Sequence, residues 1–134
     1  MKNNKYYRVY AEINLDAIVK NVDNLMALTK ENTGALAVVK ADGYGHGDVA
    51  VAKAVAQKVT GYAVATLDEA VNLRENGVKK PILVLGYVDP YEFDILVSHE
   101  ITATVFDVET AQLLADAARV QKKQAHCHIK VDTG

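Results

Sequence analysis

A lysine at the end of an apolar run is the residue of this sequence best suited to covalent chemistry. Residues 36–39 are apolar without alternation, the pattern of a strand covered on both faces in a parallel α/β sheet, and Lys40 follows directly. Ligands bind at the carboxyl ends of such strands in α/β sheets and barrels alike. A lysine amine can attack a carbonyl carbon and form a Schiff base. The position of Lys40 therefore predicts a Schiff-base lysine.

The loop after this lysine has glycine at every second position, at Gly43, Gly45 and Gly47. Glycines let a backbone approach a ligand closely and turn its N–H groups inward, and a helix beginning near Asp48 would add the positive end of its dipole. Such a loop favours an anion, most simply a phosphate. Tyr44 lies four residues past the lysine, so its hydroxyl can reach the same anion.

Simpler interpretations of both features stay open on these residues alone. A lysine at a strand end commonly extends its charge into water, and glycines commonly mark turns. The loop spacing is G-x-G-x-G, which matches neither the dinucleotide fingerprint G-x-G-x-x-G nor the phosphate loop G-x-x-x-x-G-K-[ST]. The spacing alone therefore identifies no known phosphate-binding loop.

Histidine and cysteine residues predict no metal site. His126 and His128 would share one face of a strand while Cys127 points to the other, so the three cannot chelate one ion without distorting the strand. His46 and His99 have no partner at ligand spacing. We therefore expect no metal.

Composition restricts the class of protein. The chain has 134 residues, of which 50% are hydrophobic, enough for one core. Its formal charge of -2 comes without a basic stripe, which argues against nucleic acid and for a small-molecule ligand. The single cysteine, Cys127, is consistent with a reducing cytosol. Residues 1–8 are polar and no apolar stretch reaches membrane length, so we expect a cytoplasmic protein without membrane contact.

Strands and helices alternate along the whole chain. A leading strand over 9–13 precedes a helix capped by Asn14, Thr66-Leu67-Asp68-Glu69 has the form of a capping box, and Asp107 is a further helix cap. From the lysine strand onward the pattern predicts five strands separated by four helices, hence a parallel sheet with right-handed crossovers. The strands are expected at 36–39, 62–65, 81–85, 101–106 and 125–131, and the helices at 48–56, 67–76, 91–98 and 107–120.

The lysine segment, Ala37 to Gly47, resembles the cofactor-lysine signature of bacterial alanine racemases, which depend on pyridoxal phosphate. The resemblance covers essentially the whole chain, in the family's order. One departure is Gly43, where the family often has alanine, and it is expected only to loosen the loop. The other similar blocks are 11–18, 67–70, 81–86 and 128–134.

This resemblance implies roles for four residues. Lys40 would hold pyridoxal 5'-phosphate as a Schiff base and act as the base on one face of the substrate Cα. Tyr44 would hydrogen-bond the cofactor phosphate, and Leu85, otherwise a plain core residue, would pack against the cofactor. Lys130, costly as a bare ammonium inside an apolar strand, needs a partner such as Asp132. The matching family lysine is often carbamylated and helps hold an arginine, which here would follow Gly134.

The same resemblance implies an (β/α)8 barrel, which has eight strands and about 250 residues, so five strands make a partial barrel. Residues 1–134 would be the N-terminal part of a pyridoxal-phosphate-binding barrel, with 35–134 supplying five barrel strands. The leading segment 1–14 would belong to a C-terminal β domain that this chain lacks. The implied activity is interconversion of L-alanine and D-alanine, supplying D-alanine for cell-wall peptidoglycan. The second proton carrier would be a tyrosine from the partner subunit of a homodimer.

Other functions stay open at this point. A non-catalytic, single-barrel protein that binds pyridoxal phosphate also uses a lysine at a strand end, although the Tyr44 to Gly47 loop favours a racemase. A racemase for serine or for a broader range of amino acids is a further alternative, and so is an α/β module without ligand. Residues 1–134 alone are expected to be inactive and prone to aggregate, because five barrel strands leave two open sheet edges.

Overall fold

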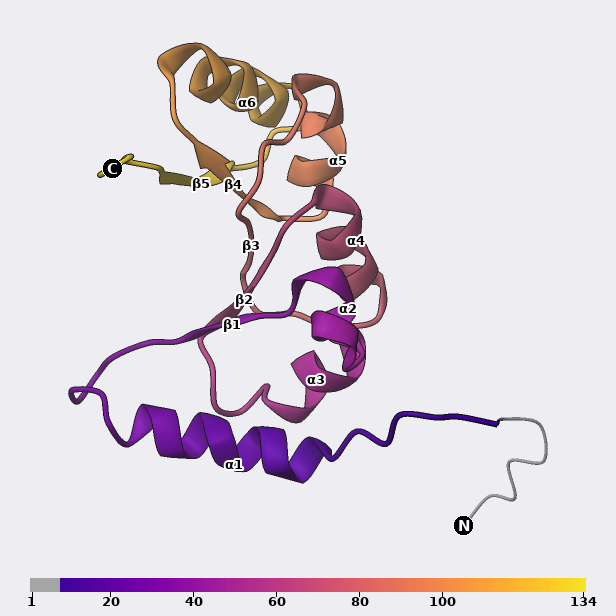
Figure 1. The fold of residues 1–134 in the computed structure, drawn as a ribbon. Coiled ribbons are helices and arrows are strands. Elements are labelled where there is room, and N and C mark those ends of the chain that lie inside the picture. Colours follow the sequence, from indigo (N-terminus) through magenta and orange to yellow (C-terminus); the bar gives the residue numbers. More distant parts are fainter. Residues whose placement is uncertain (1–7) are drawn as a thin grey trace.

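The computed structural model describes residues 8–134, in which five strands form one sheet with helices along one side (Figure 1). The strands lie in chain order, and every neighbouring pair is parallel. This arrangement confirms the parallel α/β sheet predicted from the sequence. The strands are β1 (Leu36–Val38), β2 (Gly61–Val64), β3 (Ile82–Val84), β4 (Thr102–Val105) and β5 (His126–Ile129).

Helices connect successive strands and follow one another along the outer side of the sheet (Figure 1). Within residues 8–134, none of them has the length and apolar character needed to cross a membrane. The helices are α1 (Leu15–Met26), α2 (Lys40–Gly45), α3 (Asp48–Ala54), α4 (Leu67–Glu75), the 3-10 helix η1 (Pro90–Glu92), α5 (Phe93–Ser98) and α6 (Val108–Val120).

Side-chain caps begin three of these helices where the sequence predicts them. Asn14 Oδ1 accepts a hydrogen bond from the N–H three residues later, and Asp107 Oδ1 accepts one from Thr110 at 2.7 Å. Thr66 and Glu69 form the predicted capping box, each side chain accepting from the other's backbone N–H. These bonds satisfy N–H groups that have no partner within the helix.

The hydrophobic core lies between the outer face of the sheet and the helices. Alternate residues of β2 and β3 point into it, because successive side chains of a strand point to opposite faces. Burying each large apolar side chain contributes about 1.5 to 3 kcal/mol, which fixes the helices on this face. The largest fully buried side chains are Tyr62, Phe93, Leu73, Ile82, Leu96, Ile101 and Leu114.

The opposite, inner face of the sheet is partly open, which corrects one prediction. Leu36 and Val38 are 42% and 43% exposed, so the lysine strand is not covered on both faces. The reason is that the helices and the core lie on the outer face of the sheet (Figure 1). An apolar run without alternation is typical of a strand that other elements cover on both faces. Among residues 8–134, no element covers the inner face of β1.

The predicted leading strand over 9–13 has no partner among the described residues, and its place in a C-terminal β domain stays a prediction. Residues 9–13 carry no strand assignment and are largely exposed. An extended segment becomes a strand only by pairing, and no neighbour in residues 8–134 pairs with it. The rest of the predicted 1–14 segment, residues 1–7, lies outside the described residues.

The Asp107 cap of α6 predicts a specific dependence of stability on pH. Hydrogen bonds from the Thr110 backbone and hydroxyl hold the pKa of Asp107 below its usual range. A carboxyl whose pKa is lower in the folded state stabilises the fold above its unfolded pKa of about 3.9 and loses that contribution as pH falls through the folded value. Asp107→Asn should therefore differ most from wild type above pH ~4 and converge with it in acid. Urea unfolding of both proteins across pH measures this, and a constant difference would contradict it.

Candidate functional site

Lys40 begins α2 just past the end of β1, with Val39 between them, at the carboxyl end of the strand. The ladder continues one residue past β1, because the N–H of Val39 donates to the carbonyl of Ala63 at 2.9 Å. The lysine side chain is half-buried. The ion pairs found among residues 8–134 join Lys58 to Asp23 and Arg119 to Asp116, so neither engages the Lys40 ammonium.

A left-handed turn follows the lysine where the sequence predicts a loop. Ala41, Asp42, Gly43 and Tyr44 have φ values between 51° and 59° and ψ values between 38° and 54°. This region costs an L-residue roughly 1 to 2 kcal/mol, and only Gly43 occupies it without a Cβ penalty. The turn must therefore be held by contacts elsewhere in the structure.

Backbone hydrogen bonds within the turn correct the predicted anion loop. The N–H of Gly43 donates to Val39 and that of Gly47 to Asp42, each at 2.9 Å. The N–H of Asp48, at the start of α3, donates to the Asp42 carboxylate at 3.1 Å. The N–H groups of Gly43, Gly47 and Asp48 are therefore satisfied by oxygens within the turn and are not free for a ligand. The Tyr44 side chain, which is 60% exposed, remains accessible as an anion donor.

Leu85 lies on the inner face at the carboxyl end of β3. Its N–H donates to the carbonyl of Val64 at 2.8 Å, and it follows Leu83 by two residues, so both side chains share a face. At 39% exposed it is not a plain core residue. Two strand spacings separate β3 from β1, or about 10 Å at the usual interval, which places Leu85 within reach of a ligand held at Lys40.

Lys130 lies farther from Lys40 and is exposed among residues 8–134, so its need for a charged partner stays a prediction. Its N–H donates to the carbonyl of Val105 at 2.8 Å and extends the β5 ladder. All four residues of β5, an edge strand, are exposed. Four strand spacings separate β5 from β1 along the sheet, so the described residues do not bring Lys130 into direct contact with Lys40.

Sequence reasoning missed polar and aromatic residues near this end of the sheet. Thr104 and His128 are register partners, and the Thr104 hydroxyl donates to the carbonyl of Val84 at 2.6 Å. Tyr87 and Phe106, both exposed, have ring centroids 6.2 Å apart. The period of two along a strand could have placed Thr102 with Thr104 and His126 with His128, but only the register in the structure sets the two pairs opposite each other.

The histidines add no metal centre within residues 8–134, where no group of three potential ligands gathers. The Nδ1 of His46 lies 3.0 Å from the carbonyl oxygen of Gly43 and 3.2 Å from that of Tyr44. This contact packs the imidazole against the left-handed turn. The registers also place His126 and His128 opposite Thr102 and Thr104, as expected for two residues of one face.

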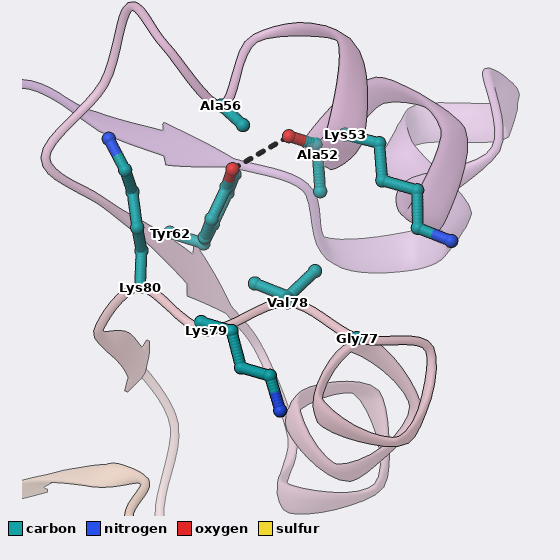
Figure 2. A pocket seen from close by; sticks show the side chains of 8 residues that line it. All are labelled: Ala52, Lys53, Ala56, Tyr62, Gly77, Val78, Lys79 and Lys80. Atoms are coloured by element: carbon teal, nitrogen blue, oxygen red, sulfur yellow. Dashed lines mark hydrogen bonds between the residues drawn. The ribbon is translucent and has the colours of Figure 1, made fainter.

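A pocket of about 280 Å³ lies near the amino ends of the strands, away from Lys40 (Figure 2). Its wall includes Tyr62, whose hydroxyl donates to the carbonyl of Ala52 at 2.6 Å. Burial raises the pKa of the Tyr62 phenol, which keeps it protonated as a donor. The Lys80 ammonium donates to the carbonyl of Val59. The Tyr62 and Lys80 hydrogen bonds join elements of the fold, so these two polar groups serve its structure.

Comparison with known proteins yields consistent matches. Residues 13–134 match the family described as alanine racemase, N-terminal domain. Alanine racemase 1 of Bacillus subtilis is 46% identical over 137 residues, covering 100% of this chain and 34% of that protein. The solved alanine racemase of Clostridium difficile is 41% identical with a TM-score of 0.93, covering 96% of this chain and 34% of that one. A histidine racemase from Leuconostoc mesenteroides has 29% identity and a TM-score of 0.81, covering 90% and 32%.

These matches identify both the fold and the family of this chain. The chain spans about a third of the length of the curated relatives that it matches. Its parallel sheet superimposes on barrel domains of alanine racemases, so the five strands correspond to part of an (β/α)8 barrel. The family match covers 122 residues of this chain, including Lys40 and the turn after it. This chain therefore belongs to the alanine racemase N-terminal domain family.

Proposed function

We propose that the complete protein interconverts L-alanine and D-alanine with pyridoxal 5'-phosphate held at Lys40. The observation that carries the proposal is a half-buried lysine at the carboxyl end of β1, in a chain of this family, outside the ion pairs of residues 8–134. Enzymes of this family use pyridoxal phosphate. In this proposal the reaction takes place in the cytoplasm and supplies D-alanine for peptidoglycan.

The residues at this end of the sheet fit the cofactor. Lys40 offers an amine for the cofactor aldehyde, the exposed Tyr44 hydroxyl can donate to its phosphate, and the exposed Leu85 side chain offers an apolar surface to its ring. When bound, the cofactor supplies an electron sink for negative charge developing at the substrate Cα. Lys40 then holds the group in place and carries the proton to and from one face of that carbon.

Racemisation needs a second proton carrier on the opposite face of Cα, and we assign it to a tyrosine of the partner subunit in a homodimer. Residues 1–134 would form the N-terminal part of the cofactor-binding barrel, and the leading segment 1–14 would pair within a C-terminal β domain. Lys130 would be carbamylated there and hold an arginine near the cofactor ring. The exposed position of Lys130 at an edge strand is compatible with such added neighbours.

The test is a racemisation assay on the complete protein loaded with pyridoxal phosphate. We expect D-alanine to form from L-alanine and the reverse, and borohydride reduction followed by peptide mapping to place the cofactor on Lys40. A label on another lysine, such as Lys53, would overturn the assignment. Binding of the cofactor to Lys40 without exchange of the alanine Cα proton would instead support a non-catalytic pyridoxal-phosphate-binding barrel.

A second candidate is a racemase for another amino acid. The likeness to a solved histidine racemase, at 29% identity and a TM-score of 0.81, favours this alternative because the same fold carries a different named substrate. Rates with alanine, serine and histidine under identical conditions separate the two. Alanine should give the highest kcat/KM if the first proposal holds.

Tyr44→Phe is expected to weaken cofactor binding while leaving the fold intact. The hydroxyl is on an exposed side chain, so its loss leaves no buried group unpaired. Losing one hydrogen bond to a charged phosphate costs about 1.5 to 3 kcal/mol in binding. Titration of the cofactor-free complete protein with pyridoxal phosphate measures the change. Unchanged affinity would contradict a phosphate contact from Tyr44.

A further inference from the structure

We propose that Glu69 is a positioning residue for Lys40, holding the backbone on which the lysine sits. The inference rests on the proposed function of Lys40. One carboxylate oxygen of Glu69, Oε1, accepts the N–H of Ala41 at 2.7 Å. The other, Oε2, accepts the N–H of Ala65 at 2.7 Å. The carboxylate therefore joins the residue after the lysine to the residue after β2.

Helix capping does not explain this arrangement. A capping box requires Glu69 to accept only the N–H of the N-cap residue Thr66, which lies at 3.3 Å, longer than the other two bonds. The bond to Ala41 crosses 28 residues of sequence and does nothing for the helix end. Two short bonds to an ionised acceptor are the stronger, charge-assisted kind.

The bond to Ala41 acts directly on the lysine. The N–H belongs to the peptide group that joins Lys40 to Ala41, so fixing it restricts the rotation that aims the lysine side chain. Ala41 is also the first residue of the left-handed turn, with φ 51°. The backbone hydrogen bonds of residues 41–47 are local, and α4 reaches the turn through two side chains: Glu69 accepts from Ala41 at its start, and Asn72 donates to the Asp48 carboxylate at 2.8 Å just past its end. Glu69 thus ties a strained turn to the sheet at the point where the lysine leaves it.

The test compares Glu69→Gln with Thr66→Ala in the complete protein. A carboxamide has one acceptor oxygen, so Glu69→Gln can keep only one of the two short bonds whichever way it turns. Thr66→Ala removes the other half of the capping box and leaves the Ala41 bond intact. The wild-type protein and both variants are freed of cofactor and then given pyridoxal phosphate. Borohydride trapping with peptide mapping then measures the rate at which Lys40 is labelled, and mass spectrometry measures amide hydrogen exchange in residues 41–47.

We expect Glu69→Gln to slow labelling of Lys40 by about tenfold and to speed exchange in the turn, the effect of losing one charge-assisted bond. Thr66→Ala should leave both close to wild type. Equal effects of the two substitutions, or no effect of Glu69→Gln, would overturn the proposal. Glu69→Asp, which keeps the charge but is too short to span both N–H groups, should repeat the Gln result. Unfolding of both Glu69 variants would also overturn it, because the residue would then be purely structural.

Failure of the proposed function gives a different result. In that case wild-type Lys40 would take no label from pyridoxal phosphate. The exchange rates would then decide by themselves whether Glu69 holds the turn after Lys40, with faster exchange in Glu69→Gln supporting it and unchanged exchange overturning it.

Discussion

Replacing Lys40 with alanine is expected to abolish the borohydride-stable attachment of pyridoxal phosphate and to lower racemisation of alanine by about 10² to 10⁴-fold or more, the contribution of one positioned acid or base. The physical reason is that the lysine amine at the carboxyl end of β1 is lost, and with it one proton carrier. The assay follows D-alanine formation, and mass spectrometry follows the label.

Lys53→Ala provides the matched control for this experiment. Lys53 is an exposed lysine of α3, thirteen residues farther along the chain. Its replacement should leave both the label and the rate unchanged. Retention of a label at full stoichiometry in Lys40→Ala would show that another amine holds the cofactor and would contradict the assignment.

Arg74→Ala is expected to destabilise the fold by about 3 kcal/mol, because one guanidinium serves several backbone carbonyls and leaves them without a donor when it is removed. Its Nε donates to His99 at 2.9 Å, and Nη1 donates to Val78 at 2.7 Å and Lys80 at 3.0 Å. Nη2 donates to Glu100 at 3.0 Å. These bonds join the end of α4 to the segments before β3 and β4.

Burial lowers the pKa of the Arg74 guanidinium, and the Glu100 carboxylate partly offsets this shift. The group stays charged at any pH near neutrality, so the destabilisation should not depend on pH between about 5 and 9. Arg74→Lys should recover only part of the loss, since an ammonium cannot match the planar fork. Urea unfolding measures both variants.

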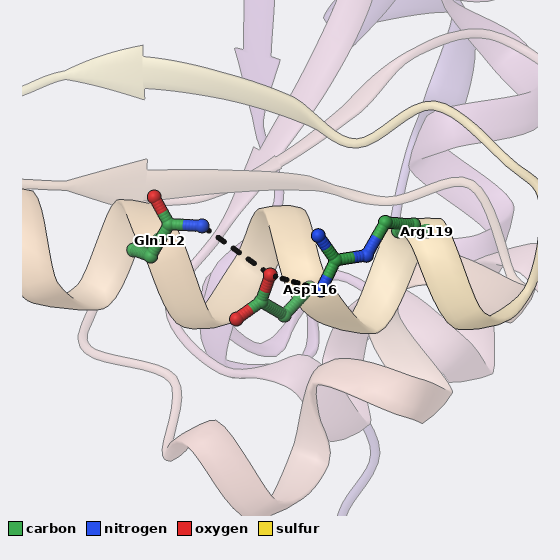
Figure 3. Close-up of polar contacts among 3 residues, drawn as sticks. All are labelled: Gln112, Asp116 and Arg119. Atoms are coloured by element: carbon green, nitrogen blue, oxygen red, sulfur yellow. Dashed lines mark hydrogen bonds and ion pairs between the residues drawn. The ribbon is translucent and has the colours of Figure 1, made fainter.

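Arg119→Ala is the control for a surface arginine (Figure 3). Arg119 Nη2 lies 3.0 Å from Asp116 Oδ1, which also accepts from Gln112 at 3.3 Å, on the exposed side of α6. Exposed pairs of this kind contribute roughly 0 to 1 kcal/mol. A loss in Arg119→Ala as large as that in Arg74→Ala would contradict the role assigned to the carbonyl contacts.

The arrangement of strands and helices was predictable because local signals agreed with the fold. The capping box at Thr66 and Glu69 and the cap at Asp107 marked helix starts that the structure confirms. Apolar runs between them marked the five strands. The inner face was not predictable, because the same apolar run at 36–38 fits a covered strand and a strand that is open on one side.

The candidate site was predictable in its residues but not in its backbone. Lys40 and Tyr44 stood out by position and chemistry, whereas the left-handed turn between them carries only one glycine among four residues and so gave no conformational signal. The Glu69 bond to Ala41 joins residues 28 apart, and no local pattern reports such a contact. A contact of this kind depends on how α4 packs against the turn, which cannot be read from the spacing of residues in the sequence.

The left-handed turn also determines how this stretch tolerates mutation. At residues 41, 42 and 44 the preference of a right-handed helix is inverted, so glycine and asparagine should be the accepted replacements and valine, isoleucine and threonine the rejected ones. An alanine substitution at 42 or 44 would therefore report the backbone strain of a positive φ as well as the loss of the original side chain. A mutant library across this segment should therefore vary Tyr44 only among residues that tolerate positive φ. A residue that cannot adopt this φ would disrupt the turn, and its variant would be inactive even if its side chain improved ligand binding.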